Sequence, residues 1–239
     1  MRRFLFWSLC FCLLFPVGLS SCDGSDSAAV IFGGTTGKLT WTLTEDGVLT
    51  ITGEGPMPDY RDGGTSETPP WYPHVNRISS LTIGEGVTRI GDYAFMLCSF
   101  VTEVVIPESV TSMGDWAFNY CTGLQEAYIG DGVTEIAAKA FAECTALKTV
   151  VIGKSIQRIG DQAFNTRSSW DQMTLEKITV LFDDIASGSF PVLESGSRGV
   201  FPKPGGWDLV SYKIYVPKGT KAEYQKNWSD YSSLIVEMQ

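Results

Sequence analysis

Residues 104–124 read VVIPESVTSMGDWAFNYCTGL, and residues 127–147, which lie 23 positions further along the chain, read AYIGDGVTEIAAKAFAECTAL. The two stretches carry an Ala-Phe pair, a cysteine and a leucine at matching positions. Self-similarity at a fixed period indicates a repeat architecture, in which each repeat forms one structural unit that stacks on its neighbours. The spacing therefore predicts a stack of 23-residue coils.

The same period extends on both sides of this stretch. Several apolar columns recur at 23-residue intervals, and we expect their side chains to fill one shared core, with the phenylalanines in a single internal column. The columns are Phe95, Phe118, Phe141 and Phe164; Val87, Val110, Val133 and Ile156; Ile90, Met113, Ile136 and Ile159; Ile83, Ile106, Ile129 and Ile152; and Cys98, Cys121 and Cys144.

Within each repeat, the local pattern predicts a strand, a turn, a second short extended piece and one helical turn. The strand segments alternate inward and outward residues, so five of them are expected to form a parallel sheet on one face. Gly-Asp-x-Ala-Phe then starts the helical turn, with Asp92, Asp115 and Asp161 as expected N-caps and none in the third copy, which has Ala137-Ala138. The strand segments are 81–83, 104–106, 127–129, 150–152 and 175–180.

The ends of such a stack need covers, because the terminal coils expose apolar edges. Residues 38–75 are predicted to form a β-hairpin cap, with strands around Leu39 to Leu43 and Leu49 to Ile51. Residues 185–239 are predicted to form a loop followed by a β-α-β cap, whose helix begins at a Thr220-x-x-Glu223 capping box. We expect both caps and the repeats of 76–184 to form one continuous body.

The N-terminus resembles an export signal. Arg2 and Arg3 precede an apolar run that ends near Val17, which is too short to span a membrane, so residues 1–21 are predicted to be a signal peptide. The run ends in Leu-Ser-Ser-Cys, which resembles the lipobox of bacterial lipoproteins and implies acylation of Cys22. An ordinary secretory leader is the alternative. Residues 22–37 are then predicted to be the lipidated cysteine and a flexible tether.

Composition excludes several classes of partner. The 239 residues include 27 acidic and 18 basic residues and one histidine. Without residues 1–21, which contribute two arginines and no acid, the balance is 16 basic against 27 acidic, a net charge of −11. Nucleic acids and anionic lipids need clustered basic residues, so neither is an expected partner. A single histidine also removes most histidine-based metal sites and proton relays.

Leu-x-x-Val-x-Ile, a Pro or Gly turn, and Val-Thr-x-Ile-Gly-Asp-x-Ala-Phe-x-x-Cys-x-x-Leu together resemble the BspA-like class of bacterial leucine-rich repeats, over residues 76–184. This resemblance implies an α/β repeat solenoid, mostly β, of the leucine-rich-repeat horseshoe type. It also implies a cell-surface or secreted protein with a role in adhesion or recognition, and no catalytic residues. Two departures, the third copy without its aspartate and an insertion near Trp170, bear on the local shape of the coils.

Other candidate sites have simpler explanations. Three cysteines at identical repeat positions fit buried apolar residues better than a metal site or disulfides. His74 lies in a proline-rich link and has no matching nucleophile, so a catalytic role is not expected. Asp183, Asp184 and Glu194 are expected to be solvated loop acids and not a glycosidase carboxylate pair. We therefore predict no catalytic residue, no metal and no cofactor.

The outward residues of the predicted sheet are the most informative candidates. One column runs Thr82, Val105, Tyr128, Val151 and Thr179, and the next runs Ser80, Glu103, Glu126, Thr149 and Lys177. Val105, Tyr128 and Val151 would form an exposed apolar strip beside the acids Glu103 and Glu126, and such strips often mark partner sites. The alternative is that β-branched residues simply favour strands. Trp170, Trp207 and Trp228 are a second aromatic group, for which packing in the core or cap is favoured.

These observations predict a non-enzymatic lipoprotein, exported to the outer membrane or cell surface, that binds an extracellular protein or glycan through its solenoid face and contacts the membrane through its anchor only. Three alternatives stay open: a carbohydrate-binding lipoprotein that uses tryptophans as stacking platforms, a carboxylate hydrolase, and a structural coat component.

Overall fold

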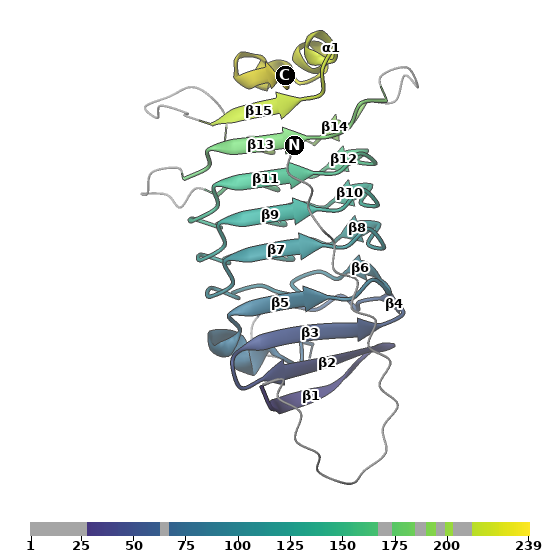
Figure 1. The fold of residues 1–239 in the computed structure, drawn as a ribbon, viewed down its shortest axis with the longest axis vertical. Coiled ribbons are helices and arrows are strands. Elements are labelled where there is room, and N and C mark those ends of the chain that lie inside the picture. Colours follow the sequence, from purple (N-terminus) through teal and green to yellow (C-terminus); the bar gives the residue numbers. More distant parts are fainter. Residues whose placement is uncertain (1–27, 63–66, 167–173, 185–189, 195–198, 203–211) are drawn as a thin grey trace.

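The computed structural model describes residues 28–62, 67–166, 174–184, 190–194, 199–202 and 212–239. The chain winds into a solenoid whose coils stack along its long axis (Figure 1). In most coils a four-residue strand lies on one side and a short strand lies on the other, which gives two parallel sheets. The prediction of a mostly β repeat solenoid with a parallel sheet is confirmed.

The first of these two sheets, here called the main sheet, contains six strands in chain order. Neighbouring strands pair in parallel and, within the repeats, residue for residue at the repeat interval, so that Val105 lies beside Tyr128 and Tyr128 beside Val151. The strands are β7 (Glu103–Ile106), β9 (Glu126–Ile129), β11 (Thr149–Ile152), β13 (Lys177–Val180), β15 (Lys213–Val216) and β16 (Ile235–Glu237).

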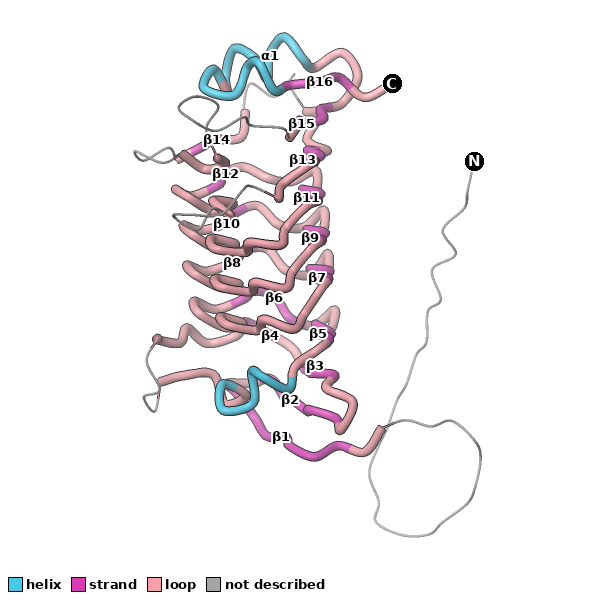
Figure 2. Tube along the Cα trace, turned by 90° about the vertical axis from the view of Figure 1, so that its left-hand side faces the viewer, coloured by secondary structure: helices cyan, strands magenta, loops and turns pink. Residues whose placement is uncertain are grey.

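The second sheet lies on the opposite side of the coils, as the view in Figure 2 shows. Its four inner strands are the short extended pieces that the sequence predicts after each turn, and they pair in parallel from coil to coil. The outer two, β4 and β14, were not predicted, and β14 lies in a stretch that was predicted to be a loop. Its strands are β4 (Gly55–Pro56), β6 (Val87–Ile90), β8 (Ser112–Met113), β10 (Glu135–Ile136), β12 (Arg158–Ile159) and β14 (Val192–Leu193).

The N-terminal end holds a separate sheet in the order β1-β2-β3-β5. The predicted hairpin is present as β2 (Leu39–Thr44) and β3 (Val48–Gly53), which pair antiparallel around a turn where Gly47 has a φ of 87°. The prediction of a flexible tether up to residue 37 is wrong for Val30–Thr36, which form β1 and pair antiparallel with β2. The Phe32 ring stacks on His74 with the ring centroids 3.7 Å apart, which helps to hold this strand in place.

The first predicted strand of the repeats does not join the main sheet. It forms β5 (Ser80–Ile83), which pairs in parallel with β3 and is not paired with β7. One reason is the proline after β7. Gly130 donates a backbone hydrogen bond to Ile106 one coil earlier, but Pro107 has no N–H to donate to Ile83.

The C-terminal end has the predicted strand, helix, strand order, in which α1 (Lys221–Asn227) follows β15 and precedes β16. The capping box is not formed, because the Thr220 hydroxyl donates to the carbonyl of Pro217 at 2.6 Å. Two 3₁₀ helices, Tyr72–Arg77 and Ser229–Leu234, complete the ends. None of the helices in the described ranges combines the length and the apolar character that crossing a membrane requires.

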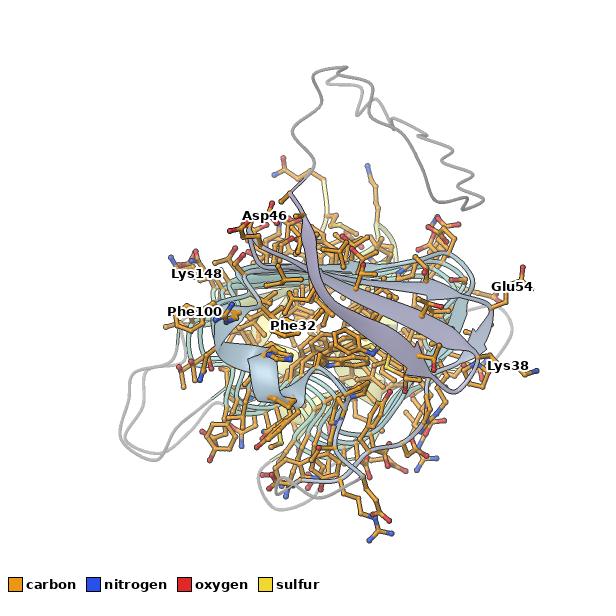
Figure 3. All side chains as sticks on the ribbon, turned by 90° about the horizontal axis from the view of Figure 1, so that it is seen from below. Phe32, Lys38, Asp46, Glu54, Phe100 and Lys148 are labelled. Atoms are coloured by element: carbon orange, nitrogen blue, oxygen red, sulfur yellow. The ribbon has the colours of Figure 1, made fainter. Side chains whose placement is uncertain are left out.

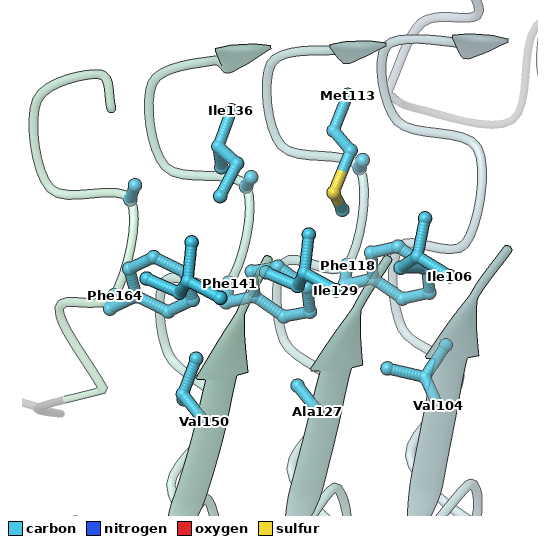
Figure 4. Packing of buried hydrophobic residues seen from close by; sticks show 14 of the residues in the cluster. Val104, Ile106, Met113, Phe118, Ala127, Ile129, Ile136, Phe141, Val150 and Phe164 are labelled. Atoms are coloured by element: carbon cyan, nitrogen blue, oxygen red, sulfur yellow. The ribbon is translucent and has the colours of Figure 1, made fainter. Parts of the chain in front are cut away.

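The interior is organised around one column of aromatic rings. Phe95, Phe118, Phe141 and Phe164 stack with centroids 5.1 to 5.2 Å apart, and all four are fully buried, as predicted. Figure 4 shows the last three of these rings. Trp71 extends the column before the repeats and Phe201 extends it after them. The end segments therefore continue the core of the repeats, so that a single cluster of buried residues runs from the N-terminal sheet to the C-terminal helix.

The predicted helical turn after each Gly-Asp is not formed. In this segment alternate backbone N–H groups donate to the next coil, for example from Phe95 to the carbonyl of Ala117 at 2.7 Å. The N–H groups between them donate within their own coil, for example from Met96 to the carbonyl of Tyr93 at 3.3 Å. The aspartates are likewise not N-caps. Asp92 accepts from the N–H of Asp115, and Asp115 accepts from the N–H of Ala138, both at 2.9 Å. A glycine precedes Asp115 because a Cβ at Gly114 would lie 2.2 Å from Asp92 Oδ1.

Candidate functional site

The five predicted site residues come together on the outer face of the main sheet. Val105, Tyr128 and Val151 occupy neighbouring positions on β7, β9 and β11, and Glu103 and Glu126 lie side by side on β7 and β9. Val105 is 55% exposed, which is unusual for a valine in the centre of a strand. The face therefore presents apolar side chains to solvent over adjacent coils, with carboxylates next to them.

Tyr128 is the polar centre of this face. Its hydroxyl donates a hydrogen bond of 2.5 Å to Glu126 Oε2 on the same strand. This hydrogen bond is the main cause that raises the pKa of Tyr128 to about 12, with smaller contributions from burial and from the charges of Glu126 and Glu103. The hydrogen bond restrains the orientation of the Tyr128 ring. A partner that packs on the ring face therefore causes little further loss of side-chain conformational entropy.

The register extends both columns by one strand beyond the predicted residues, to Tyr215 and Lys213 on β15. The outer column that begins at Val105, called the apolar column, continues through the predicted Thr179 on β13 to Tyr215. The column that begins at Glu103, called the charge column, contains Glu103, Glu126, Thr149, Lys177 and Lys213. Its charge therefore changes from negative to positive along the solenoid. The Lys177 ammonium lies 5.1 Å from the centre of the Tyr215 ring, in a cation–π contact.

Two parts of the predicted columns differ from expectation. Ser80 and Thr82 lie on β5, which is paired with β3, so neither column continues through hydrogen-bonded neighbours below β7. Thr179 is only 8% exposed and thus adds little to the surface. The apolar strip at the surface is therefore centred on exposed Val105 of β7 and on half-buried Tyr128 and Val151 of β9 and β11.

A second group of surface side chains, all of them half-buried, lies on the turn side of the coils, and sequence reasoning missed it. The rings of Tyr93 and Trp116 stack in parallel 6.1 Å apart, and the Lys139 ammonium lies 4.2 Å from the Trp116 ring centre. These three residues occupy the variable position of Gly-Asp-x-Ala-Phe, and each has a φ between 56° and 59°. Bulky residues seldom adopt this left-handed conformation. The sequence could have indicated this group, because its three members recur at intervals of 23 residues.

The cysteines are buried, free and spaced as predicted. The thiols of Cys121 and Cys144 each donate to a phenylalanine carbonyl at 3.1 Å. Burial raises the pKa values of the Cys98 and Cys121 thiols well above the ordinary value, so these groups stay protonated and are poor nucleophiles. They pack as small apolar residues.

The remaining candidates do not assemble into a reactive centre. His74 lies in the first 3₁₀ helix, stacked on Phe32. Glu194 forms an ion pair of 2.6 Å with Arg158, and Asp183 is an exposed loop residue. Within the described ranges, no three histidine, cysteine, aspartate or glutamate side chains are grouped as a metal ion would require.

Two hollows of the described surface are open and polar. One of about 980 Å³ lies at the N-terminal end near Asp59, Tyr60 and Asp92, and another of about 460 Å³ lies over the second sheet. Their charged residues are largely paired with one another. Arg89 bonds both Asp59 and Asp92, and Arg158 bonds both Glu135 and Glu194. Neither hollow has the apolar lining with a few converging polar groups that is typical of a small-molecule site.

Several predicted features lie outside the described residues. They are the signal peptide, Cys22, Trp170 and Trp207. Trp228, the third member of that predicted aromatic group, is 2% exposed and packs against Tyr224 in the C-terminal end, as favoured from the sequence.

Comparison with known proteins agrees with the architecture. Residues 72–190 match the BspA-type leucine-rich repeat region in six copies. A leucine-rich repeat protein from Eubacterium ventriosum is 28% identical and superposes with a TM-score of 0.57, covering 79% of this chain and 44% of that one. The pneumococcal vaccine antigen PcpA, 16% identical, shares the fold with a TM-score of 0.54 over 83% of this chain and 46% of its own. The chain thus spans less than half the length of either protein. No curated protein matches the sequence.

Proposed function

This chain belongs to the family of BspA-type leucine-rich-repeat proteins, and from that membership we propose that it is a cell-surface recognition and adhesion protein that binds an extracellular macromolecule through the outer face of its main sheet. The family is one of bacterial surface proteins that are generally non-enzymatic and bind protein partners. The observation that carries the proposal is the surface strip formed by exposed Val105 and half-buried Tyr128 and Val151, beside Glu103 and Glu126.

A protein is favoured over a glycan as the partner. Sugar rings stack on the open face of an aromatic side chain, but Trp41, Trp71 and Trp228 are buried. Trp116, the remaining tryptophan of the described ranges, has Tyr93 stacked on it and the Lys139 ammonium over its ring. The apolar column instead offers small branched side chains and a fixed tyrosine, which suit packing against protein side chains.

The proposal includes export and a lipid anchor on Cys22. It is supported by the basic start, the short apolar run and the small residues before that cysteine. Two or three acyl chains at about 0.8 kcal/mol per buried methylene would hold the domain firmly on a membrane. Incorporation of labelled fatty acid into the protein, lost in Cys22→Ser, tests the anchor. Protease accessibility on whole cells tests whether the domain faces outward.

The binding face is tested by truncating its tyrosine. Binding of the purified protein to arrays of extracellular proteins and of glycans identifies the partner class. Tyr128→Ala is expected to weaken binding at least tenfold, since exposed aromatic anchors contribute about 2 kcal/mol or more to interfaces. The matched control is Tyr120→Ala, which removes a tyrosine that is 46% exposed on the turn side. Equal binding by both variants and the parent would move the site away from the main sheet.

A further inference from the structure

The charge column has a symmetry that the family fold does not require. Thr149 on β11 is neutral, two glutamates lie on the two strands before it, and two lysines lie on the two strands after it. Glu103, Lys177 and Lys213 are exposed, and Glu126 is half-buried. Reversing the order of the strands therefore exchanges every acid for a base, with β11 at the centre.

A second copy of the chain can use this symmetry. A rotation of 180° about an axis parallel to β11 turns the copy face to face with the first and reverses the order of its coils. The charge column of one copy then lies over the charge column of the other. Glu103 opposes Lys213 of the second copy, Glu126 opposes its Lys177, and Thr149 meets Thr149. A rotation about the long axis of the solenoid would instead place like coils together and leave the charges unmatched.

From this complementarity we infer that the partner of the main sheet is a second copy of this chain, bound in an antiparallel, two-fold arrangement. The inference rests on the proposed function, because it identifies the occupant of the same face. A two-fold interface uses the same patch on both copies, so one patch must be complementary to itself. The charge column meets that requirement, and the two ends of the face supply four opposite-charge pairs per dimer.

The apolar column fits the same arrangement. The rotation places Val151 against Val151 at the centre, Tyr128 against Thr179, and Val105 against Tyr215, so every residue of the column meets an uncharged residue of the other copy. The strands of the main sheet form a nearly straight stack in Figure 2, which lets two such faces meet over all five strands from β7 to β15. Copies on neighbouring cells could pair in this way and attach the cells to each other. Copies on one cell could pair likewise and form a surface layer.

One residue opposes the arrangement and serves as a sensitive probe. Lys148 precedes β11 and projects from the edge of the sheet in Figure 3, so the axis brings it near Lys148 of the second copy. This repulsion is exposed and screened by salt, so it weakens the dimer without preventing it. Lys148→Ser removes it and is expected to tighten association.

Charge reversal with rescue tests the inference. Sedimentation equilibrium of the purified protein is expected to show a reversible dimer that weakens as salt increases. Glu103→Lys and Lys213→Glu are each expected to raise the dissociation constant roughly tenfold or more, because like charges then face each other twice per dimer. The double variant, which restores opposite charges across the interface, is expected to return the constant to within a few-fold of the parent.

The control is Glu54→Lys, the same change of charge at an exposed position that Figure 3 shows on the opposite edge from Lys148. It is expected to leave the dimer unchanged, and urea unfolding of all variants checks that each is folded. A monomer up to about 1 mM, a dimer indifferent to the single reversals, or a double variant as weak as the singles overturns the inference. The protein could instead stay monomeric and bind a foreign protein, with this binding lost in Tyr128→Ala. In that case the inference is wrong and the proposed function stands.

Discussion

The inner and outer faces of the main sheet are built from alternate residues of the same strands, yet they follow different rules. On β9 the inner residues Ala127 and Ile129 are buried, and the corresponding inner positions of β7 and β11 carry valine and isoleucine. The outer residues Glu126 and Tyr128 have a different residue type on β11, where Thr149 and Val151 occupy their places. Repetition is thus strict inside and loose outside.

The difference follows from the geometry of stacking. Each coil rises by one strand spacing, so the phenylalanine ring of every coil must fill a space of the same height, about 5 Å. The outer side chains meet water and are free of that constraint. The inner face therefore determines the fold, and the outer face can differ between coils to suit a partner.

The largest expected effect comes from breaking the inner column. Phe118→Ala removes a ring that stacks between Phe95 and Phe141, and is expected to lower the free energy of unfolding by about 3 to 5 kcal/mol. Val105→Ala, on the outer face of the same coil, is expected to change it by less than about 0.5 kcal/mol. Urea unfolding followed by tryptophan fluorescence measures both. Similar losses in the two variants would contradict the distinction between faces.

A second test uses pH to compare the buried Tyr231 with Tyr128, which is half-buried on the outer face. Burial is the main cause that raises the pKa of Tyr231 to about 12, whereas the hydrogen bond to Glu126 is the main cause at Tyr128. An unfolded tyrosine loses its proton near pH 10, while folded Tyr231 keeps it to about pH 12. Its contribution to stability is therefore complete below pH 10 and is lost as pH rises from 10 to 12.

We expect Tyr231 to account for about 2 kcal/mol of the alkaline loss of stability. Urea unfolding at pH 9 and pH 12 measures it as the difference in pH dependence between the parent and Tyr231→Phe. Tyr128→Phe is the matched comparison on the outer face, and it is expected to reduce the alkaline loss less. Identical pH profiles for the parent and Tyr231→Phe would refute the assignment.

The smallest expected effect concerns the aspartate ladder at the edge of the coils. Asp115→Ala removes the acceptor for the N–H of Ala138, which is expected to cost about 1 kcal/mol because water can replace an exposed partner. Asp115→Asn keeps an acceptor oxygen and is expected to cost less than half as much. Thermal unfolding of the two variants separates these values. A larger loss in the asparagine variant would mean that the charge, and not the hydrogen bond, matters.

The sequence predicted the features that recur with the 23-residue period. The phenylalanine column, the buried cysteines and the strands from β7 to β11 each follow from an interval that can be counted. The role of Asp92 could not be deduced in this way, because a carboxylate before Ala-Phe fits both a helix cap and a bond to the next coil. The choice depends on which backbone N–H it meets, and this is set by packing between coils.

The candidate site was only partly visible for a related reason. Alternation placed Val105, Tyr128 and Val151 on one face, and the register agrees. Lys213 and Tyr215 escaped notice because the insertion after the fourth copy breaks the 23-residue count, so only the paired strands show that they continue the columns. Val30–Thr36 was misassigned because glycines in a strand resemble a linker when their antiparallel neighbour is unknown.

The unpaired boundary between β5 and β7 has a mechanical consequence. Hydrogen bonds between coils lie along the long axis. A force that pulls the two ends apart would therefore load the contacts between successive coils in series, and the weakest of these contacts would break first. On the main-sheet side the weakest step is at Pro107, where β5 and β7 share no ladder, so the tension is borne by the second sheet, the ring stack and the turn-side hydrogen bonds such as the one from Phe95 to Ala117. Under shear the solenoid is therefore expected to part there, leaving the N-terminal sheet on one fragment and the outer face of β7, β9 and β11 intact on the other.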